Sequence, residues 1–233
     1  MNRLLASVAV ALWIPLAVLP AQSRRFSSSD AADASERLTG RRSHMDEAVR
    51  LIVGQRLEGP AITMRVVRDD RASSRGEGLK VINVFEQAPK GSVIVVCLDG
   101  DPNYAVLGAT FATLSKSRQI SGIVTNGAMR GLSDLRRIGV PIFSRGTVAG
   151  SAGGHYRLES VGQTVSCGGA QVSQGDLIVG DADGIAVVGR DSVASVRALA
   201  QRLRDEKEKT LPLIAKHRSY TKAIEELSRK PEP

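Results

Sequence analysis

Aromatic side chains are scarce in this sequence of 233 residues, where Phe, Trp and Tyr together make up 3%. Proteins that bind single-stranded nucleic acid stack successive bases on aromatic rings. The scarcity therefore argues against a base-stacking platform. The chain is nevertheless 42% hydrophobic, which at this length is enough to bury a sizeable core. We expect that core to consist mainly of Val, Ile, Leu and Ala.

Cysteine and histidine, the usual ligands of structural zinc, are also few. The chain has two cysteines, Cys97 and Cys167, and three histidines, His44, His155 and His217. None of them has the CxxC or HxxxH spacing of common structural zinc sites, so such a site is not expected. Cys97 lies within the apolar run VIVVCL, which predicts a buried free thiol rather than a disulfide.

Carboxylates are absent from the first 29 residues, which we assign to a targeting segment rather than to the fold. Two interpretations stay open. The basic start, the apolar middle and the ending AQS are typical of a secretory signal, which would give a secreted or periplasmic protein. The acid-free composition and the stretch RRFSSS, with cleavage after Phe26, are typical of a mitochondrial presequence, and we incline to that address.

A permanent membrane span is not expected in this segment. The uncharged run from Leu4 to Gln22 is barely long enough to cross a bilayer, and Pro15 and Pro20 interrupt it. The net charge of +8 allows an anionic surface, nucleic acid or an acidic protein as partner, but charge alone does not choose among them.

The rest of the chain is expected to fold as a mixed α/β domain with flanking helices. We divide it into a helical lead-in (30–58), a core domain (59–190) and closing C-terminal helices (191–233). The lead-in is expected to contain a helix over MDEAVRLIVG, because its apolar residues recur with a helical period. Pro212 is expected to divide the C-terminal helix.

Within the core domain the first part alternates strand and helix patterns. PAITMRVV, GSVIVVCLDG, GIVT and VPIFSRG indicate strands, while LKVINVFEQA and AVLGATFATLSKS indicate helices. The stretch RDDRASSRGEG is expected to be a polar loop, and so is SAGGHYRLES. From residue 163 onward, short β runs separated by glycine turns predict hairpins, with DADG as a hairpin turn.

A candidate anion site follows two of these strands. If a helix begins near Gly108, the first-turn amides of Ala109, Thr110 and Phe111 point outward and form a cradle for a carboxylate or phosphate. The next strand leads to NGAMR, and if the two strands are neighbours its Arg130 lies at the same sheet edge. Arg130 could then hold the same anion bidentately.

The stretches GPAITMRVVRDD, APKGSVIVVCLDG, AVLGATFATLSKSRQISGIVTNGAMRGLSDL, VPIFSRG and GGAQVSQGDLIVGDADGIAVV resemble the RraA-like family. This family includes the regulator of ribonuclease activity A and metal-dependent 4-hydroxy-4-methyl-2-oxoglutarate aldolases. The resemblance implies a swivelling β/β/α domain and a homotrimeric ring with ligand sites near subunit contacts. It also implies that helix-start amides and Arg130 hold a pyruvate-like carboxylate, with Arg130 the catalytic residue if the protein is active.

The metal-site acids of the aldolases are missing from this sequence. Ala109 stands where the family pattern has a glutamate, and Asn126 and Gly131 stand where it has aspartates. A hard dication needs oxygen ligands and nearby negative charge, which these residues do not supply. Asp134 is the candidate replacement ligand, with Asp99 and Asp101 on the neighbouring loop as further candidates.

Two functions follow from this pattern. We favour a non-catalytic RraA-like protein with a degenerate aldolase site and no cofactor, which acts as a binding, regulatory or assembly component. The resemblance offers a precedent, since the bacterial regulator inhibits an RNA-degrading machine through protein contacts; a protein or ribonucleoprotein partner would fit. The alternative is a carbon–carbon lyase acting on 2-oxo acids, with Mg²⁺ or Mn²⁺ in a rearranged site.

Overall fold

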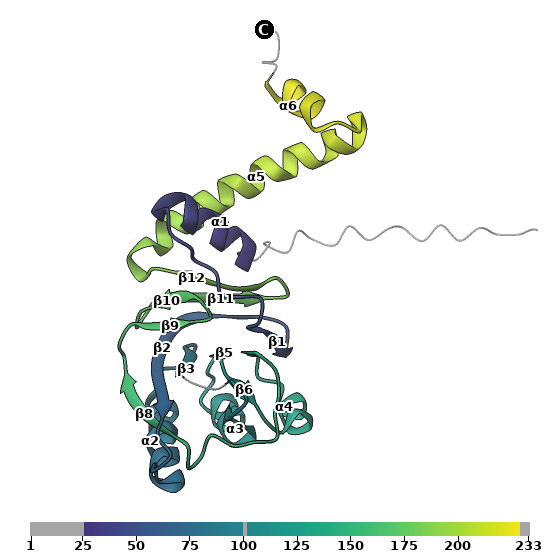
Figure 1. Ribbon diagram of the computed structural model, residues 1–233. Helices are drawn as coiled ribbons and strands as arrows, with labels where there is room; N and C mark the ends of the chain where they lie inside the picture. Colours follow the sequence, from purple (N-terminus) through teal and green to yellow (C-terminus); the bar gives the residue numbers. More distant parts are fainter. Residues whose placement is uncertain (1–25, 100–101, 229–233) are drawn as a thin grey trace, which may run out of the picture.

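The computed structural model describes residues 26–99 and 102–228 (Figure 1). Most of the expected targeting segment, residues 1–25, lies outside this part, as does Asp101. Among the described helices none is long and apolar enough to cross a membrane. Phe26 is buried and its carbonyl accepts a hydrogen bond from Arg56, so the expected cleavage point after Phe26 falls within the folded part.

A curled, mixed sheet forms the centre of the described chain, with the strand order β1-β7-β5-β3-β2-β11-β12 and with β8 paired to β2. Its strands are β1 (Arg50–Val53), β2 (Leu57–Arg68), β3 (Val93–Asp99), β5 (Gly122–Thr125), β7 (Ile142–Ser144), β8 (Tyr156–Val161), β11 (Leu177–Asp181) and β12 (Gly184–Val188). Two small two-stranded sheets flank it, formed by β4 (Ala105–Leu107) with β6 (Ala128–Met129) and by β9 (Val165–Cys167) with β10 (Ala170–Val172).

The long strand β2 joins the two halves of the sheet. Its start pairs with β11, its middle and end run parallel to β3, and its end also pairs with β8. Gly59 is required where β2 passes the turn before β3, because a Cβ added there would lie 2.0 Å from the carbonyl oxygen of Gly91. The backbones of β2 and the turn before β3 can approach this closely only without a side chain.

Helices cover both sides of the sheet. They are α1 (Ser28–Thr39), α2 (Ser74–Gln87), α3 (Ala109–Ser117), α4 (Leu132–Ile138), α5 (Val193–His217) and α6 (Tyr220–Ser228), with a short 3₁₀ turn at Arg190–Ser192. In Figure 1, α2, α3 and α4 lie at one end of the domain, while α1 and α5 lie beside β11 and β12 at the other. The core is mostly aliphatic, as predicted, and Phe85 and Phe143 are fully buried in two separate clusters of it.

The predicted fold class, a mixed α/β domain with closing C-terminal helices, is confirmed. The strands over PAITMRVV, GSVIVVCLDG, GIVT and VPIFSRG form, and β11 and β12 form a hairpin with DADG at its turn. Cys97 and Cys167 are buried and free, as expected for Cys97. The C-terminal region is helical, as predicted.

Three predicted helices differ in the structure. Residues 45–54 do not form a helix, since Arg50–Val53 is strand β1, which pairs antiparallel with β7; the helical lead-in (30–58) is therefore helical only at its start. The helix predicted over AVLGATFATLSKS begins only at Ala109, because its first residues pair with β6. Pro212 does not divide the C-terminal helix, because α5 runs through it.

Two predicted loops also contain regular structure. Helix α2 already begins at Ser74, with Ser73 as its N-cap, inside the stretch RDDRASSRGEG. Strand β8 lies within SAGGHYRLES and pairs with the end of β2. Both elements border the cavity described next, so these two differences affect the composition of the candidate site.

Candidate functional site

A cavity of about 450 Å³ lies between α2, α3, β4, β8 and the start of α4. All of the predicted ligand-binding residues line it: Gly108, Ala109, Thr110, Phe111 and Arg130. Asp134, the candidate metal ligand, lines it as well. The structure thus brings together residues that the sequence places on two separate strand ends, as expected from the parallel pairing of β3 with β5 and of β4 with β6.

Gly108 and Arg130 pack directly against each other. A Cβ added to Gly108 would lie 3.3 Å from Cγ of Arg130 and 3.8 Å from its Nε. The backbone amide of Arg130 donates to the carbonyl of Leu107 at 3.2 Å, which fixes the two segments in register. Glycine at position 108 therefore leaves room for the arginine to lie over the start of α3. Within the described chain, Arg130 has no ion pair with a carboxylate.

The start of α3 offers fewer free amides than the sequence suggested. Gly108 is the N-cap, and no side chain caps the helix. The amide of Phe111, expected to point outward unpaired, instead donates to the carbonyl of Gly108 at 3.1 Å. The amides of Ala109 and Thr110 have no acceptor in the described chain, so these two amides remain for an anion beside Arg130.

Asp134 lies at the cavity edge but is already paired. Its carboxylate accepts a hydrogen bond from Arg137 at 2.6 Å, on the same helix. Asp134 thus pairs with Arg137, at the i, i+3 spacing, and not with Arg130 at the i, i+4 spacing. Both partners are exposed, so this pair contributes little to stability, and Asp134 is turned toward a cation of its own helix.

Glu77 is an acid of the cavity that the sequence did not indicate. It lies in the first turn of α2, where one carboxylate oxygen accepts from Lys80 at 2.6 Å and the other from the backbone amide of Leu158 at 2.8 Å. The hydrogen bond from Lys80 lowers the pKa of Glu77, and the amide of Leu158 adds to this effect. Glu77 therefore carries a negative charge and ties α2 to β8.

Strand β8 brings a second arginine to the cavity. Tyr156 and Arg157 line it, next to Leu158. The guanidinium of Arg157 lies 3.5 Å from the carboxylate of Asp69. The alternation of Tyr156, Leu158 and Ser160 with charged residues is the signal that could have identified the strand. The glycines just before it favoured the prediction of a loop.

The sequence match to known families extends over the same region. The family model described as RraA-like, Aldolase/RraA, matches residues 28–187. The chain belongs to the RraA-like family. A protein of Halalkalibacterium halodurans, described as a candidate 4-hydroxy-4-methyl-2-oxoglutarate aldolase, is 31% identical over 180 residues, which cover 77% of this chain and 79% of that protein.

Solved structures agree with this assignment. An uncharacterized protein from Pseudomonas syringae superposes with a TM-score of 0.75 and 25% identity, over 85% of this chain and 88% of that one. Streptomyces coelicolor RraAS2, described as an unusual member of the RNase ES inhibitor RraA protein family, superposes with a TM-score of 0.66 and 25% identity. That match covers 78% of this chain and 88% of the other. The RraA-like fold is therefore shown, as the resemblance predicted.

Asn126, which stands where the family pattern has its first aspartate, has a structural role in this RraA-like protein. The side-chain carbonyl of Asn126 accepts from the backbone amide of Leu98 at 2.6 Å, and its amide donates to the carbonyl of Leu98 at 2.9 Å. Both ends of the side chain are thus occupied by β3. Asn126 borders a different, smaller depression rather than the cavity that holds Arg130.

The other positions expected to carry acids supply no ligand either. Ala109 lines the cavity with a methyl group, and Gly131, the N-cap of α4, has the left-handed conformation, with φ of 76°. Asp99 pairs with Arg65 at 2.6 Å and borders the smaller depression beside Asn126. Asp101 lies outside the described residues.

These donors do not fit a divalent metal. In the described chain no group of three or more His, Cys, Asp or Glu side chains lies close enough to hold one. Of the two acids that line the cavity, Glu77 is bound by Lys80 and Leu158, and Asp134 by Arg137. A hard cation prefers several oxygen ligands, and it would have to displace these partners. The cavity instead suits a small ligand with a carboxylate end facing Arg130.

Proposed function

We propose that this RraA-like protein binds a small 2-oxo acid without catalysing its cleavage, and that it acts as a binding or regulatory component. The observation that carries the proposal is the double hydrogen bond of Asn126 with Leu98. At position 126 the family pattern has an acid, whereas here the side chain links the ends of two strands. The carboxylate-binding half of the site, with Arg130 and the amides of Ala109 and Thr110, is retained.

The lining of the cavity supports this ligand class. Apolar side chains from several elements surround the polar residues, which suits the short carbon chain of a 2-oxo acid; they are Val66, Val81, Val96, Val106, Leu107, Phe111 and Leu158. Arg130 and two free amides at one side match a carboxylate. A volume of about 450 Å³ lies within the range of small-molecule sites.

A lyase with a rearranged site is the second candidate. It is favoured by the two carboxylates, Glu77 and Asp134, that line the same cavity as Arg130. It would require both acids to leave the partners that they have in the structure. The absence of a three-residue acid or imidazole group in the described chain weighs against it.

Enzyme assays separate the two candidates. Pyruvate release from oxaloacetate and from 4-hydroxy-4-methyl-2-oxoglutarate is measured with the purified protein in Mg²⁺, in Mn²⁺ and in EDTA. The proposal expects no release above the buffer control in any of the three. Metal-dependent release that disappears in Arg130→Ala would overturn it and establish the lyase.

The assembly and the cellular address are further parts of the proposal. We propose a homotrimer, which sedimentation analysis of the purified protein tests directly. A protein or ribonucleoprotein partner is proposed on the family precedent of protein inhibition. The mitochondrial address, proposed from the arginine–serine ending of the targeting segment, is tested by fusing residues 1–29 to a fluorescent reporter.

A further inference from the structure

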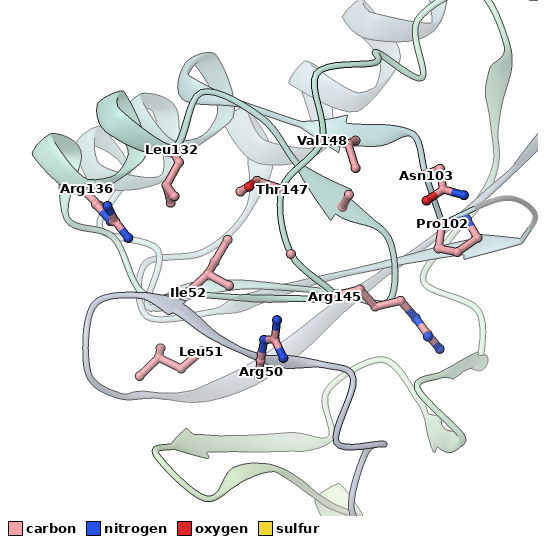
Figure 2. A pocket seen from close by; sticks show the side chains of 12 residues that line it. Arg50, Leu51, Ile52, Pro102, Asn103, Leu132, Arg136, Arg145, Thr147 and Val148 are labelled. Carbon is pink, nitrogen blue, oxygen red and sulfur yellow. The ribbon is translucent and has the colours of Figure 1, made fainter.

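A second, larger cavity of about 620 Å³ lies on the other side of α4 from the candidate site. It is bounded by β1, by α4, by the segment after β7 and by residues 102 and 103 (Figure 2). Alternate residues around α4 face the two cavities: Leu132 and Arg136 line the larger one, and Gly131 and Asp134 line the candidate site. The two cavities therefore share a wall but have separate linings.

Three arginines from different elements define the larger cavity. Arg50 begins β1, Arg136 lies on α4, and Arg145 directly follows β7. Figure 2 shows Arg136 and Arg145 at opposite sides of the cavity, with Arg50 between them. Strands β1 and β7 hold two of the three in place, because Arg50 is paired with Ser144, the residue before Arg145.

No ion pair within the described chain neutralises the three arginines of this cavity. None of its 12 described lining residues is an Asp or Glu. None of the three arginines forms an ion pair there, whereas the neighbouring Arg137 pairs with Asp134. Arg145 also borders a depression that contains Asp46, Glu47 and Asp183; Asp46 pairs with Arg42 at 2.7 Å, and none of the three acids forms an ion pair with Arg145 in the described chain.

The other residues that line the cavity are suited to a compact ligand with polar ends. Ile52, Leu132 and Val148 supply apolar surface, and Thr147 and Asn103 supply polar groups. Each guanidinium offers a planar set of donors that matches a carboxylate or phosphate oxygen pair. Because the three arginines come from three sides, one small monoanion would engage them poorly, whereas a ligand with several separated anionic groups would engage them together.

We propose that this cavity binds a small polyanion, a molecule with two or more phosphate or carboxylate groups, through Arg50, Arg136 and Arg145. This site is distinct from the one that holds Arg130. The ligand neutralises the three guanidinium groups. Its separate anionic groups contact different arginines and so connect β1, α4 and the segment after β7. The proposal does not depend on whether the candidate site is catalytic.

Titration calorimetry at constant ionic strength tests the site, with citrate and pyrophosphate as polyanion probes and acetate as a monoanion. One polyanion is expected to bind per chain, and acetate much more weakly. Each of Arg50→Gln, Arg136→Gln and Arg145→Gln should weaken the binding about tenfold or more, the effect of losing one charge-assisted hydrogen-bond pair. Arg202→Gln is the matched control, since Arg202 is exposed, lies on α5 and lines neither cavity.

Arg130→Gln is a second control, which separates this site from the proposed 2-oxo acid site. It should leave pyrophosphate binding unchanged even if it abolishes binding of a 2-oxo acid. The proposal is overturned if neither polyanion binds, if Arg202→Gln weakens binding as much as the other three variants, or if only Arg130→Gln does so. It is also overturned if the three cavity variants change the oligomeric state in sedimentation, because the cavity is then filled by a second copy of the chain.

Discussion

Asn126 bonds both backbone groups of Leu98, its carbonyl oxygen to the amide at 2.6 Å and its amide nitrogen to the carbonyl at 2.9 Å. Leu98 belongs to β3 and Asn126 directly follows β5, so the pair holds the ends of two parallel strands at the sheet edge that leads to the candidate site. An aspartate can accept from the amide of Leu98, but it cannot donate to its carbonyl.

Asn126→Asp should therefore lower the free energy of unfolding by about 1–3 kcal/mol, the cost of leaving a buried polar group without its partner. Urea unfolding at pH 7 measures the change. The matched control is Asn83→Asp on the exposed face of α2, which should stay within about 0.5 kcal/mol. A variant Asn126→Asp as stable as the parent, and further stabilised by Mg²⁺, would show that position 126 still serves a metal.

Gly108→Ala should weaken ligand binding without unfolding the protein. The added methyl group would lie 3.3 Å from Cγ of Arg130, so the arginine must shift from its place over the start of α3. The φ of Gly108 is −155°, which alanine adopts without strain. We expect pyruvate, a probe with a single carboxylate, to bind at least about tenfold more weakly, with the thermal midpoint nearly unchanged.

Gly189→Ala provides the control for that experiment, because Gly189 has a negative φ and its nearest contact for an added Cβ is 4.0 Å away. Equal loss of pyruvate binding in the two variants would mean that Arg130 does not depend on the space above Gly108.

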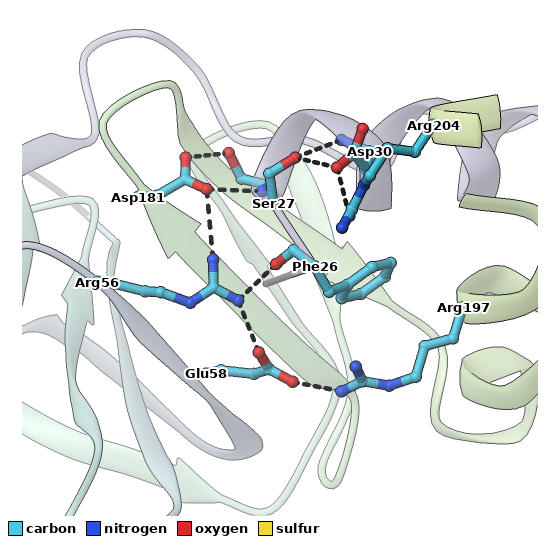
Figure 3. Close-up of polar contacts among 9 residues, drawn as sticks. Phe26, Ser27, Asp30, Arg56, Glu58, Asp181, Arg197 and Arg204 are labelled. Atoms are coloured by element: carbon cyan, nitrogen blue, oxygen red, sulfur yellow. Dashed lines mark hydrogen bonds and ion pairs between the residues drawn. The ribbon is translucent and has the colours of Figure 1, made fainter. Parts of the chain in front are cut away.

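Glu58 makes stability dependent on pH. It lies between Arg56, at 2.7 Å, and Arg197 (Figure 3). Burial raises the pKa of Glu58, but the hydrogen bonds from Arg197 and Arg56 outweigh it, so the net pKa lies below the ordinary value of 4.5. A depressed pKa means that the charged carboxylate stabilises the folded state above that value, and that this contribution is lost as the pH falls through the folded-state pKa.

Glu58→Gln should accordingly be about 1–3 kcal/mol less stable than the parent at pH 7, because it leaves Arg56 and Arg197 without their shared acid. The difference should stay constant down to about pH 5 and shrink below it. Urea unfolding between pH 7 and pH 3 gives the two curves. A difference that does not change with pH would contradict the role of the charge.

The two buried thiols should differ in reactivity. The hydrogen bond with the Cys167 thiol lowers the pKa of Cys97 and outweighs burial and the charge of Asp99, which raise it; nearby Arg65 adds to the lowering. The same hydrogen bond, together with burial, raises the pKa of Cys167 well above its ordinary value. Cys97 also borders a depression, whereas Cys167 is fully buried.

Iodoacetamide should therefore modify Cys97 in the native protein and leave Cys167 intact until urea is added, as peptide mass spectrometry can show. Cys167→Ala should slow the modification of Cys97 at a fixed pH near 8, because the thiol that stabilises its thiolate is gone. Faster or unchanged labelling of Cys97 in that variant would contradict the coupling of the two thiols.

The sequence identified the parts of the site that lie close together along the chain. Gly108 and Arg130 lie in the segments after β3 and β5, two strands that were recognised from their apolar runs, and the parallel pairing of β3 and β5 brings these segments to one edge. The short strands β4 and β6, which directly precede Gly108 and Arg130, were not recognised. Glu77 was missed, because what places it at the cavity is a hydrogen bond to Leu158, 81 residues away in the chain. No local pattern contains that contact.

The same reason explains the error at β1. Its apolar residues fit a helical period. Arg50–Val53 nevertheless pairs with the edge of β7 that β5 leaves free, and this pairing satisfies backbone hydrogen-bonding groups of both strands. Tertiary pairing decided between two conformations that the local sequence allows. The role of Asn126 was likewise not visible, since an asparagine in a turn gives no indication of the strand that it bonds.

The central claim, carboxylate binding without a metal, is tested most directly by titration calorimetry of pyruvate, which carries a single carboxylate, with the purified protein in EDTA and again in Mg²⁺. We predict binding of the same affinity in both buffers, and its loss in Arg130→Gln. Binding that requires Mg²⁺, or that survives in Arg130→Gln, would contradict the account.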